Sequence, residues 1–166
     1  MDAILLRRSI RKYTSKPVPE GVVRDILKAA MSAPSAGDER PWEFIVIRDK
    51  NILEELMKVH PYAQMLNETS VAIVVCGHVK TEVYSDFWVQ GCAAATENIL
   101  IEATAKGLGC VWLGIYPMQD RVSGIKKLLG IPEDVMPLAL VPLGYPAEKK
   151  KAENRFDVCR IHDDKW

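Results

Sequence analysis

Residues 7–13 read RRSIRKY and residues 33–42, one helix further on, read APSAGDERPW. Planar guanidinium groups give a phosphate paired, charge-assisted hydrogen bonds that lysine cannot match in geometry. Small residues in a Pro-Ser-Ala-Gly turn leave backbone amides and carbonyls uncovered, so a flat ligand can approach them closely. These two segments therefore predict a ligand cradle in two pieces. From the residues alone, a solvated basic surface and an ordinary helix-ending turn are the alternatives.

Apolar spacing on both sides of these segments predicts alternating helices and strands. A short first helix runs to about Arg8, and residues 9–18 become extended because Pro17 and Pro19 forbid its continuation. Further helices are predicted at 22–30, 51–59, 87–106 and 120–129, and strands at 43–48, 71–76, 111–115 and 135–143. This order gives an α+β fold, built as a three-layer α/β/α arrangement.

The bulk properties exclude several classes of protein. Lys plus Arg number 22, as do Asp plus Glu, so no global field favours nucleic acid or an anionic membrane surface, and an anion site must be local. The 166 residues fit one domain spanning 1–166. No apolar run is long enough for a membrane span and no signal-peptide pattern opens the chain, so we expect a soluble, cytoplasmic protein.

Cysteine and histidine residues stand singly in the sequence. No spacing suggests a disulfide framework, a thioredoxin-type pair or a zinc site, so buried, reduced thiols are the default interpretation and no metal is implied. Core or surface roles are expected for the isolated histidines. The residues concerned are Cys76, Cys92, Cys110, Cys159, His60, His78 and His162.

The longest helical pattern, residues 87–106, carries only Glu97, Glu102 and Lys106 as charges. A helix that is apolar or small on nearly every side must be buried on most sides. Gly91 and the alanines at 93–95 would let another backbone come close, so we infer that the helix packs against a second subunit. The alternative is a central helix wholly buried inside one monomer, which is harder to achieve in a small domain.

The order and spacing of four motifs resemble the nitroreductase-like flavoproteins. That family begins with an Arg-(Arg/His)-Ser-x-(Arg/Lys) box and carries a Pro-Ser-(Ser/Ala)-x-Asn-x-Gln-Pro-Trp box about a helix later. Residues 107–114, GLGCVWLG, are similar to its mid-chain flavin-edge segment, and residues 142–146, PLGYP, to its closing strand and turn. The resemblance implies the family's FMN-binding fold, in which a mostly antiparallel central sheet is flanked by helices and a long central helix forms the dimer.

The resemblance also implies which residues hold FMN. The first box would contact the phosphate, ribityl chain and pyrimidine edge, while the Pro-Ser-Ala turn would reach the flavin of the partner subunit. A backbone N–H at 113–114 would lie beside the flavin N5 and O4 edge, and a basic residue in the C-terminal tail would close over the phosphate. The implied residues are Arg7, Arg8, Ser9, Arg11, Pro34, Ser35, Ala36, Leu113, Gly114 and Arg155.

The sequence departs from the family pattern at three places. The usual Asn and Gln of the second box are Asp38 and Arg40, which could form a local ion pair. The Lys-x-Arg expected in the tail reads Glu-Asn-Arg at 153–155, which leaves one phosphate cation, Arg155. Long pocket-shaping insertions are absent, so an open pocket with a broad preference is expected. The regions 62–67 and 80–86, where a lid would lie, carry no specificity signature.

We therefore expect a homodimeric FMN-dependent oxidoreductase in which NADH or NADPH passes a hydride to flavin N5. A small-molecule acceptor such as a nitroaromatic or quinone would then use the same face in a ping-pong cycle. No side chain is assigned as a catalytic acid or base, because the matched motifs are cofactor contacts. The alternatives are a flavin-binding storage or redox-sensor protein, and a specialised dehalogenase or flavin-consuming member of the family.

Overall fold

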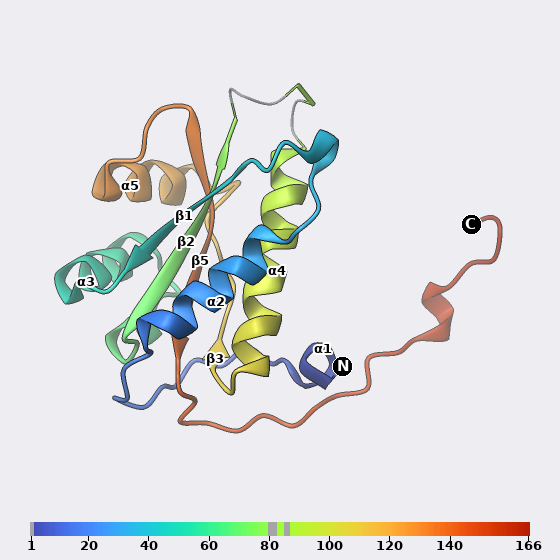
Figure 1. The fold of residues 1–166 in the computed structure, drawn as a ribbon, viewed down its shortest axis with the longest axis horizontal. Helices are drawn as coiled ribbons and strands as arrows, with labels where there is room; N and C mark the ends of the chain where they lie inside the picture. Colours follow the sequence, from blue (N-terminus) through green and yellow to red (C-terminus); the bar gives the residue numbers. More distant parts are fainter. Residues whose placement is uncertain (1, 80–82, 85–86) are drawn as a thin grey trace.

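A computed structural model of the chain describes residues 2–79, 83–84 and 87–166, and it shows a sheet between two layers of helices (Figure 1). The five strands follow the order β1-β2-β5-β3, with β4 also paired to β5, and every pairing is antiparallel. The strands are β1 (Trp42–Ile47), β2 (Val71–His78), β3 (Gly109–Cys110), β4 (Leu113–Gly114) and β5 (Val135–Gly144). The helices are α1 (Asp2–Leu6), α2 (Glu20–Met31), α3 (Lys50–Val59), α4 (Trp88–Ala105) and α5 (Gln119–Leu129).

Strand β2 separates two apolar cores. Successive side chains of a strand point to opposite faces of the sheet, so Ile73 and Val75 join one core while Ala72 and Val74 join the other. Helices α2 and α4 cover the first face, and α3 and α5 cover the second (Figure 1). The predicted α+β, three-layer fold with an antiparallel sheet is confirmed.

The sequence predicted most element boundaries to within two residues, and two differences bear on the site. Helix α1 ends at Leu6 instead of about Arg8, so residues 7–13 lie outside it. The strand predicted at 111–115 consists only of β4, and β3 precedes it as a separate short strand. Helix α5 ends at Leu129 and Gly130 stops it as expected, because Gly130 adopts a left-handed conformation with φ of 64°.

Helix α4 is not wholly enclosed by its own chain. Val89, Ala93, Ala94, Glu97 and Ile101 are half-buried along one side, whereas Gly91, Ala95 and Ile99 face the core. Val89, Ala93, Glu97 and Ile101 follow one another at intervals of four positions, so they form one stripe along the helix. The alternative of a helix buried inside one monomer is therefore wrong, and dimerisation stays a prediction.

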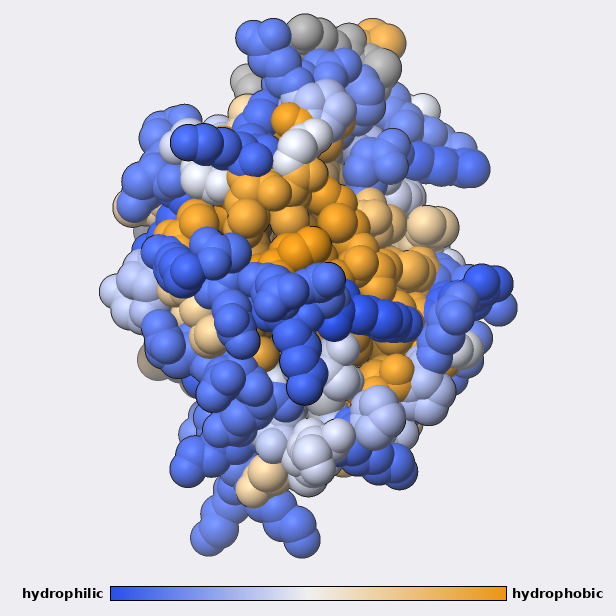
Figure 2. All heavy atoms as spheres, turned by 90° about the vertical axis from the view of Figure 1, so that its left-hand side faces the viewer, coloured by the Kyte–Doolittle hydropathy of each residue, from blue (hydrophilic) through white to orange (hydrophobic). Residues whose placement is uncertain are grey.

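The side of the molecule that carries α3, α5 and β1 (Figure 1) also has an apolar region. Figure 2 shows this face, with polar side chains around a band of apolar ones. A hollow of about 370 Å³ lies there beside β1, lined on its apolar side by Ile45, Leu129, Ile131 and Val135. Within the described residues, β1 pairs only with β2, so its other edge has no strand partner.

The last residues of the chain leave the body. Residues 151–166 are all exposed, and they run past α1 and then away from the other elements (Figure 1). We call this segment the C-terminal arm. It contains one short 3₁₀ turn, η3 (Val158–Arg160). None of the described helices combines the length and apolar character needed to cross a bilayer.

Two regions, 62–67 and 80–86, are expected to shape a pocket entrance. Residues 62–67 form a turn that ends in the 3₁₀ segment η2 (Gln64–Asn67), with Met65 and Leu66 buried. Of the second region, 80–86, residues 80–82 and 85–86 lie outside the described part of the chain.

Candidate functional site

The first box lies directly against the predicted flavin-edge segment. After α1 the chain is extended, Ser9 forms a parallel bridge with Cys110, and the Ile10 N–H donates to the Cys110 carbonyl at 2.9 Å. Strand β4 begins three residues later at Leu113. Residues 7–11 and 113–114, which are about 100 positions apart in sequence, therefore lie along the same edge of the sheet.

Gly109 makes this contact possible. A Cβ atom at position 109 would lie 2.6 Å from Ile10 Cγ2, which is closer than a Cβ atom comes to a non-bonded atom in real proteins. The absence of a side chain lets the box pack directly on β3. This close approach fixes the position of the backbone from which the arginine side chains project.

The arginines of the box have different partners. Arg7 Nε lies 3.3 Å from Glu97 Oε1 on α4 and its side chain is 22% exposed, so one carboxylate already neutralises part of its charge. Arg11 is exposed, and its backbone N–H donates to Glu148 Oε1 at 2.6 Å. This bond, from the Arg11 amide, is the main cause that holds the pKa of Glu148 below its usual value.

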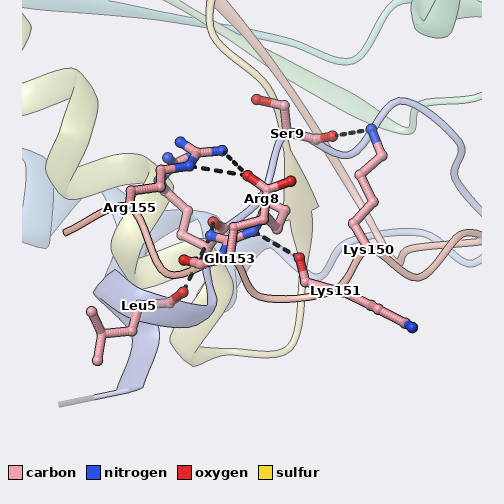
Figure 3. Close-up of polar contacts among 8 residues, drawn as sticks. Leu5, Arg8, Ser9, Lys150, Lys151, Glu153 and Arg155 are labelled. Carbon is pink, nitrogen blue, oxygen red and sulfur yellow. Dashed lines mark hydrogen bonds and ion pairs between the residues drawn. The ribbon is translucent and has the colours of Figure 1, made fainter. Parts of the chain in front are cut away.

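Arg8 is bound to the beginning of the C-terminal arm. Its guanidinium donates to the Lys151 carbonyl at 3.0 Å and to the Glu153 carbonyl at 3.3 Å (Figure 3). Further bonds go to the carbonyls of Leu5 and Arg7. With these donors committed to carbonyls, the side chain of Arg8 positions the arm within this chain, whereas the resemblance predicted a flavin contact.

The tail brings a second cation to the box. Lys150 Nζ donates to the Ser9 carbonyl at 2.6 Å (Figure 3). The expected cation, Arg155, is exposed and its guanidinium pairs with Glu153 at 3.0 Å. Sequence comparison with the family motif considered only positions 153–155 and so missed Lys150. The run of lysines at 149–151 was the available signal, although such a run is most simply explained as a solvated loop.

The second box lies at the other end of α4. Pro34, Ser35 and Ala36 line a hollow of about 420 Å³ with Phe87, Gln90, Gly91 and Ala94 from the beginning of that helix. Helix α1 lies near the end of α4 instead (Figure 1). One chain therefore does not bring the two predicted halves of the cradle together. That separation agrees with the expectation that the Pro-Ser-Ala turn serves the partner's site.

The altered residues of the second box bind each other. Arg40 donates to Asp38 through Nη2 at 2.6 Å and Nε at 2.9 Å, which confirms the expected ion pair. The hydrogen bonds from Arg40 hold the pKa of Asp38 below its usual value. Both residues have positive φ, 55° and 52°, a conformation that costs non-glycine residues energy. The Ser35 hydroxyl accepts the Arg40 N–H at 2.9 Å and so stabilises the loop.

Strand β4 carries the predicted flavin edge. Leu113 is buried, whereas a Cβ atom built on Gly114 would meet nothing within 4 Å. The Gly114 carbonyl accepts from His60 Nε2 at 3.0 Å and from Arg121 Nη1 at 2.8 Å. Sequence reasoning gave His60 only a core or surface role and did not consider Arg121, since no motif links either to position 114.

The cysteines follow the expected pattern with one exception. Cys76, Cys92 and Cys110 are buried and Cys159 is exposed, so the expectation of a buried thiol is wrong for Cys159. Burial raises the pKa of the Cys110 thiol to about 12, which keeps it protonated although it touches the box. Its placement therefore supports packing instead of reactivity.

A model of the family described as "Nitroreductase family" matches residues 4–61 and 54–145. The chain belongs to the nitroreductase family. A relative from Methanothermobacter thermautotrophicus, named "Putative NADH dehydrogenase/NAD(P)H nitroreductase", is 51% identical over 166 residues, covering 100% of this chain and 87% of the relative.

Solved nitroreductase structures agree with this chain in fold. An "FMN-dependent Nitroreductase" from Clostridium difficile R20291 superposes with a TM-score of 0.92 at 30% identity, covering 100% of both chains. A "putative nitroreductase in complex with fmn" from Desulfovibrio desulfuricans gives a TM-score of 0.86 at 29% identity, covering 99% of this chain and 96% of that one. The predicted family and enzyme class, an NAD(P)H-dependent oxidoreductase, are confirmed.

Proposed function

We propose that the protein is a homodimeric, FMN-dependent NAD(P)H oxidoreductase that reduces nitroaromatic, quinone or related acceptors in a ping-pong cycle. Each subunit would be one domain spanning residues 1–166. The observation that carries the proposal is the hydrogen bond from Ile10 to Cys110, because it joins the phosphate box to the flavin-edge segment. Unpaired cysteine spacing fits a reducing compartment, so we propose a cytoplasmic location.

The residues at this site fit FMN in shape and charge. The absence of a side chain at Gly114 leaves β4 open to a flat ring. Arg7 and Arg11 belong to the box and Lys150 contacts it, so the site carries positive charge that suits a phosphate dianion. Nε of Arg121 is buried without a hydrogen-bond partner among the described residues, so the site has a donor to offer. When bound, FMN supplies the two-electron chemistry of the cycle.

The protein's own contribution is binding and orientation. Arg7, Ser9 and Arg11 would hold the phosphate and ribityl chain, and Arg155 would close over them from the tail. The backbone at Leu113 and Gly114 would place the reacting ring edge where a nicotinamide, and then an acceptor, can stack on it. Protons would come from solvent, since no titratable side chain of the described residues is proposed for that role.

The homodimer is part of the same proposal. Apolar side chains of the arm have no cover in their own chain, since Phe156 is 74% exposed and Trp166 is 101% exposed. Leu5 and Leu6 of α1 are 60% and 56% exposed, and α1 lies beside α4. Uncovered apolar side chains on both α1 and the arm favour an interaction surface there. In a twofold dimer, Pro34, Ser35 and Ala36 of one subunit would complete the partner's flavin site.

The first test is an absorbance spectrum of the purified, desalted protein, followed by anaerobic addition of NADH and then NADPH. A flavin spectrum that bleaches with a donor and recovers with p-benzoquinone or nitrobenzene is expected. A yellow protein that neither donor bleaches would favour the storage or sensor function instead. A colourless protein that also fails to bind added FMN would refute the proposal.

A matched pair of variants localises the cofactor. Arg11→Ala removes a cation of the box and should weaken FMN binding about tenfold or more, since charge-assisted bonds are roughly twice as strong as neutral ones. Arg24→Ala removes an exposed arginine of α2 that pairs with Glu20 and should leave FMN affinity unchanged. If Arg11→Ala and Arg24→Ala change FMN affinity equally, the first box is not part of the FMN site.

A further inference from the structure

The carbonyl of Gly114 is held by side chains from two other parts of the fold. His60, at the end of α3, approaches with Nε2 at 3.0 Å, and Arg121, in the first turn of α5, donates through Nη1 at 2.8 Å. Strand β4 is two residues long and pairs only with β5 among the described elements. Such a short strand has little hydrogen bonding of its own to fix its outer edge.

The surroundings of His60 determine which ring nitrogen carries the proton. The residue is 1% exposed, and its Nδ1 accepts the Tyr62 N–H at 3.3 Å. Nε2 must then carry the hydrogen that is donated to Gly114. Burial lowers the pKa of His60, so the ring is neutral near pH 7 and acts as a fixed donor.

The same edge of β4 presents the backbone N–H of Gly114. The Ile115 N–H donates to the Leu138 carbonyl of β5 at 2.9 Å, so Ile115 faces β5. In an extended chain successive residues face opposite edges, and the N–H and C=O of one residue share an edge. The Gly114 N–H therefore lies on the outer edge, beside the carbonyl that His60 and Arg121 hold.

Arg121 adds a positive charge at this edge. Its guanidinium lies 5.5 Å from the centre of the Tyr62 ring, a distance at which a cation and an aromatic ring attract each other. Its Nε is buried with no partner in the described part of the chain. The side chain is half-buried, so solvent screens its charge less than it screens the charge of an exposed lysine.

We propose that His60 and Arg121 are positioning residues of the cofactor site, which fix the backbone of Gly114 and hold a positive charge beside the flavin edge. The inference rests on the proposed function, since it requires FMN to lie along β4. A nearby positive charge favours added electron density on the bound ring. The reduction potential of the bound flavin should therefore depend on the charge at position 121.

The test is the midpoint potential of the FMN-loaded protein, measured by spectroelectrochemistry. Arg121→Gln should shift the potential to a more negative value, while Arg121→Lys, which keeps the charge, should stay close to the original protein. Lys127→Gln is the matched control, because it removes one positive charge from an exposed position of the same helix. That control should leave the potential unchanged.

A second measurement tests the role of His60 independently of charge. His60→Leu should raise the FMN dissociation constant about tenfold, since the Gly114 carbonyl loses a donor. His60→Gln should restore most of the affinity, because its amide nitrogen can reach the position of Nε2. Circular dichroism of each variant establishes that it is folded. If Arg121→Gln does not fold, the two His60 variants still test the positioning role.

The outcomes separate this inference from the proposed function. A wild-type protein that binds no FMN would refute the proposed function. A protein that binds FMN, but whose Arg121→Gln potential equals that of Lys127→Gln or of Arg121→Lys, would overturn the charge assignment. Equal FMN affinity in His60→Leu and His60→Gln would overturn the positioning role of His60.

Discussion

Strand β2 and the C-terminal arm are opposites in how much of their apolar surface their own chain covers. Val71 to Val75 are 0% exposed, with helices on both sides of the strand. In the arm, Phe156, Val158 and Ile161 are 74%, 66% and 53% exposed. Burial of apolar surface is the main stabilising contribution to folding. The difference implies that the body supplies its own stability, whereas the apolar side chains of the arm gain no burial from their own chain.

The largest effect is expected from a cavity in the body. Ile73→Ala removes a fully buried side chain between α2, α4 and the sheet, so the free energy of unfolding should fall by about 2–5 kcal/mol. Urea unfolding at fixed protein concentration measures the change. Val46→Ala, on the more exposed edge strand β1, should cost less than about 1 kcal/mol. Equal losses would contradict the expectation that burial in β2 contributes more stability than the exposed edge strand β1.

A smaller effect, confined to assembly, is expected in the arm. Phe156→Ala should raise the dimer dissociation constant by about tenfold, because exposed aromatic anchors often dominate interfaces. Sedimentation at several concentrations measures the change. Lys165→Ala, a polar truncation on the same arm, should leave dissociation unchanged. If Phe156→Ala leaves the dimer dissociation constant unchanged, the arm does not dock through Phe156.

The junction between body and arm should respond to loss of Arg8. Arg8→Ala removes the bonds to the Lys151 and Glu153 carbonyls, each worth about 1 kcal/mol. Trypsin should then cleave at 150–151 several-fold faster, as followed by mass spectrometry. Arg24→Ala, which breaks an exposed pair on α2, is the control. An unchanged rate of cleavage would show that Arg8 does not hold the beginning of the arm in place.

The smallest expected effect is a pH dependence of the body. Burial is the main cause that lowers the pKa of His60; the hydrogen bond to the Gly114 carbonyl and the charge of Asp120 act against it, and the charge of Arg121 acts in the same direction as burial. Between the lowered pKa and the ordinary value of about 6.5, the unfolded chain binds more protons than the folded one. Stability from His60 is therefore complete above about pH 6.5 and falls as the pH decreases.

Comparison with His60→Gln isolates this pH effect. The difference in unfolding free energy between the two proteins should shrink below about pH 6.5, because glutamine does not titrate and carboxylates contribute equally to both. A difference that stays constant from pH 7.5 to 5 would show that His60 titrates normally.

The sequence determined the layers of the fold because local patterns encode them. Apolar spacing located α3, α4, α5 and β5, and Gly130 gave the end of α5, since these signals need only neighbouring residues. The order of four motifs also gave the family and the first box. The tail residues were predicted less well. The lysines at 149–151 have no periodicity that distinguishes a cation that contacts the site from lysines on a solvated loop.

The tertiary structure alone decided which distant residues meet. The packing of Ile10 on Gly109 joined the box to β3, and the folding of α3 and α5 around β4 brought His60 and Arg121 to one carbonyl. The same structure placed Pro34–Ala36 at the far end of α4 from the box. Contacts of this kind depend on the relative placement of whole elements, which no local pattern of one sequence contains.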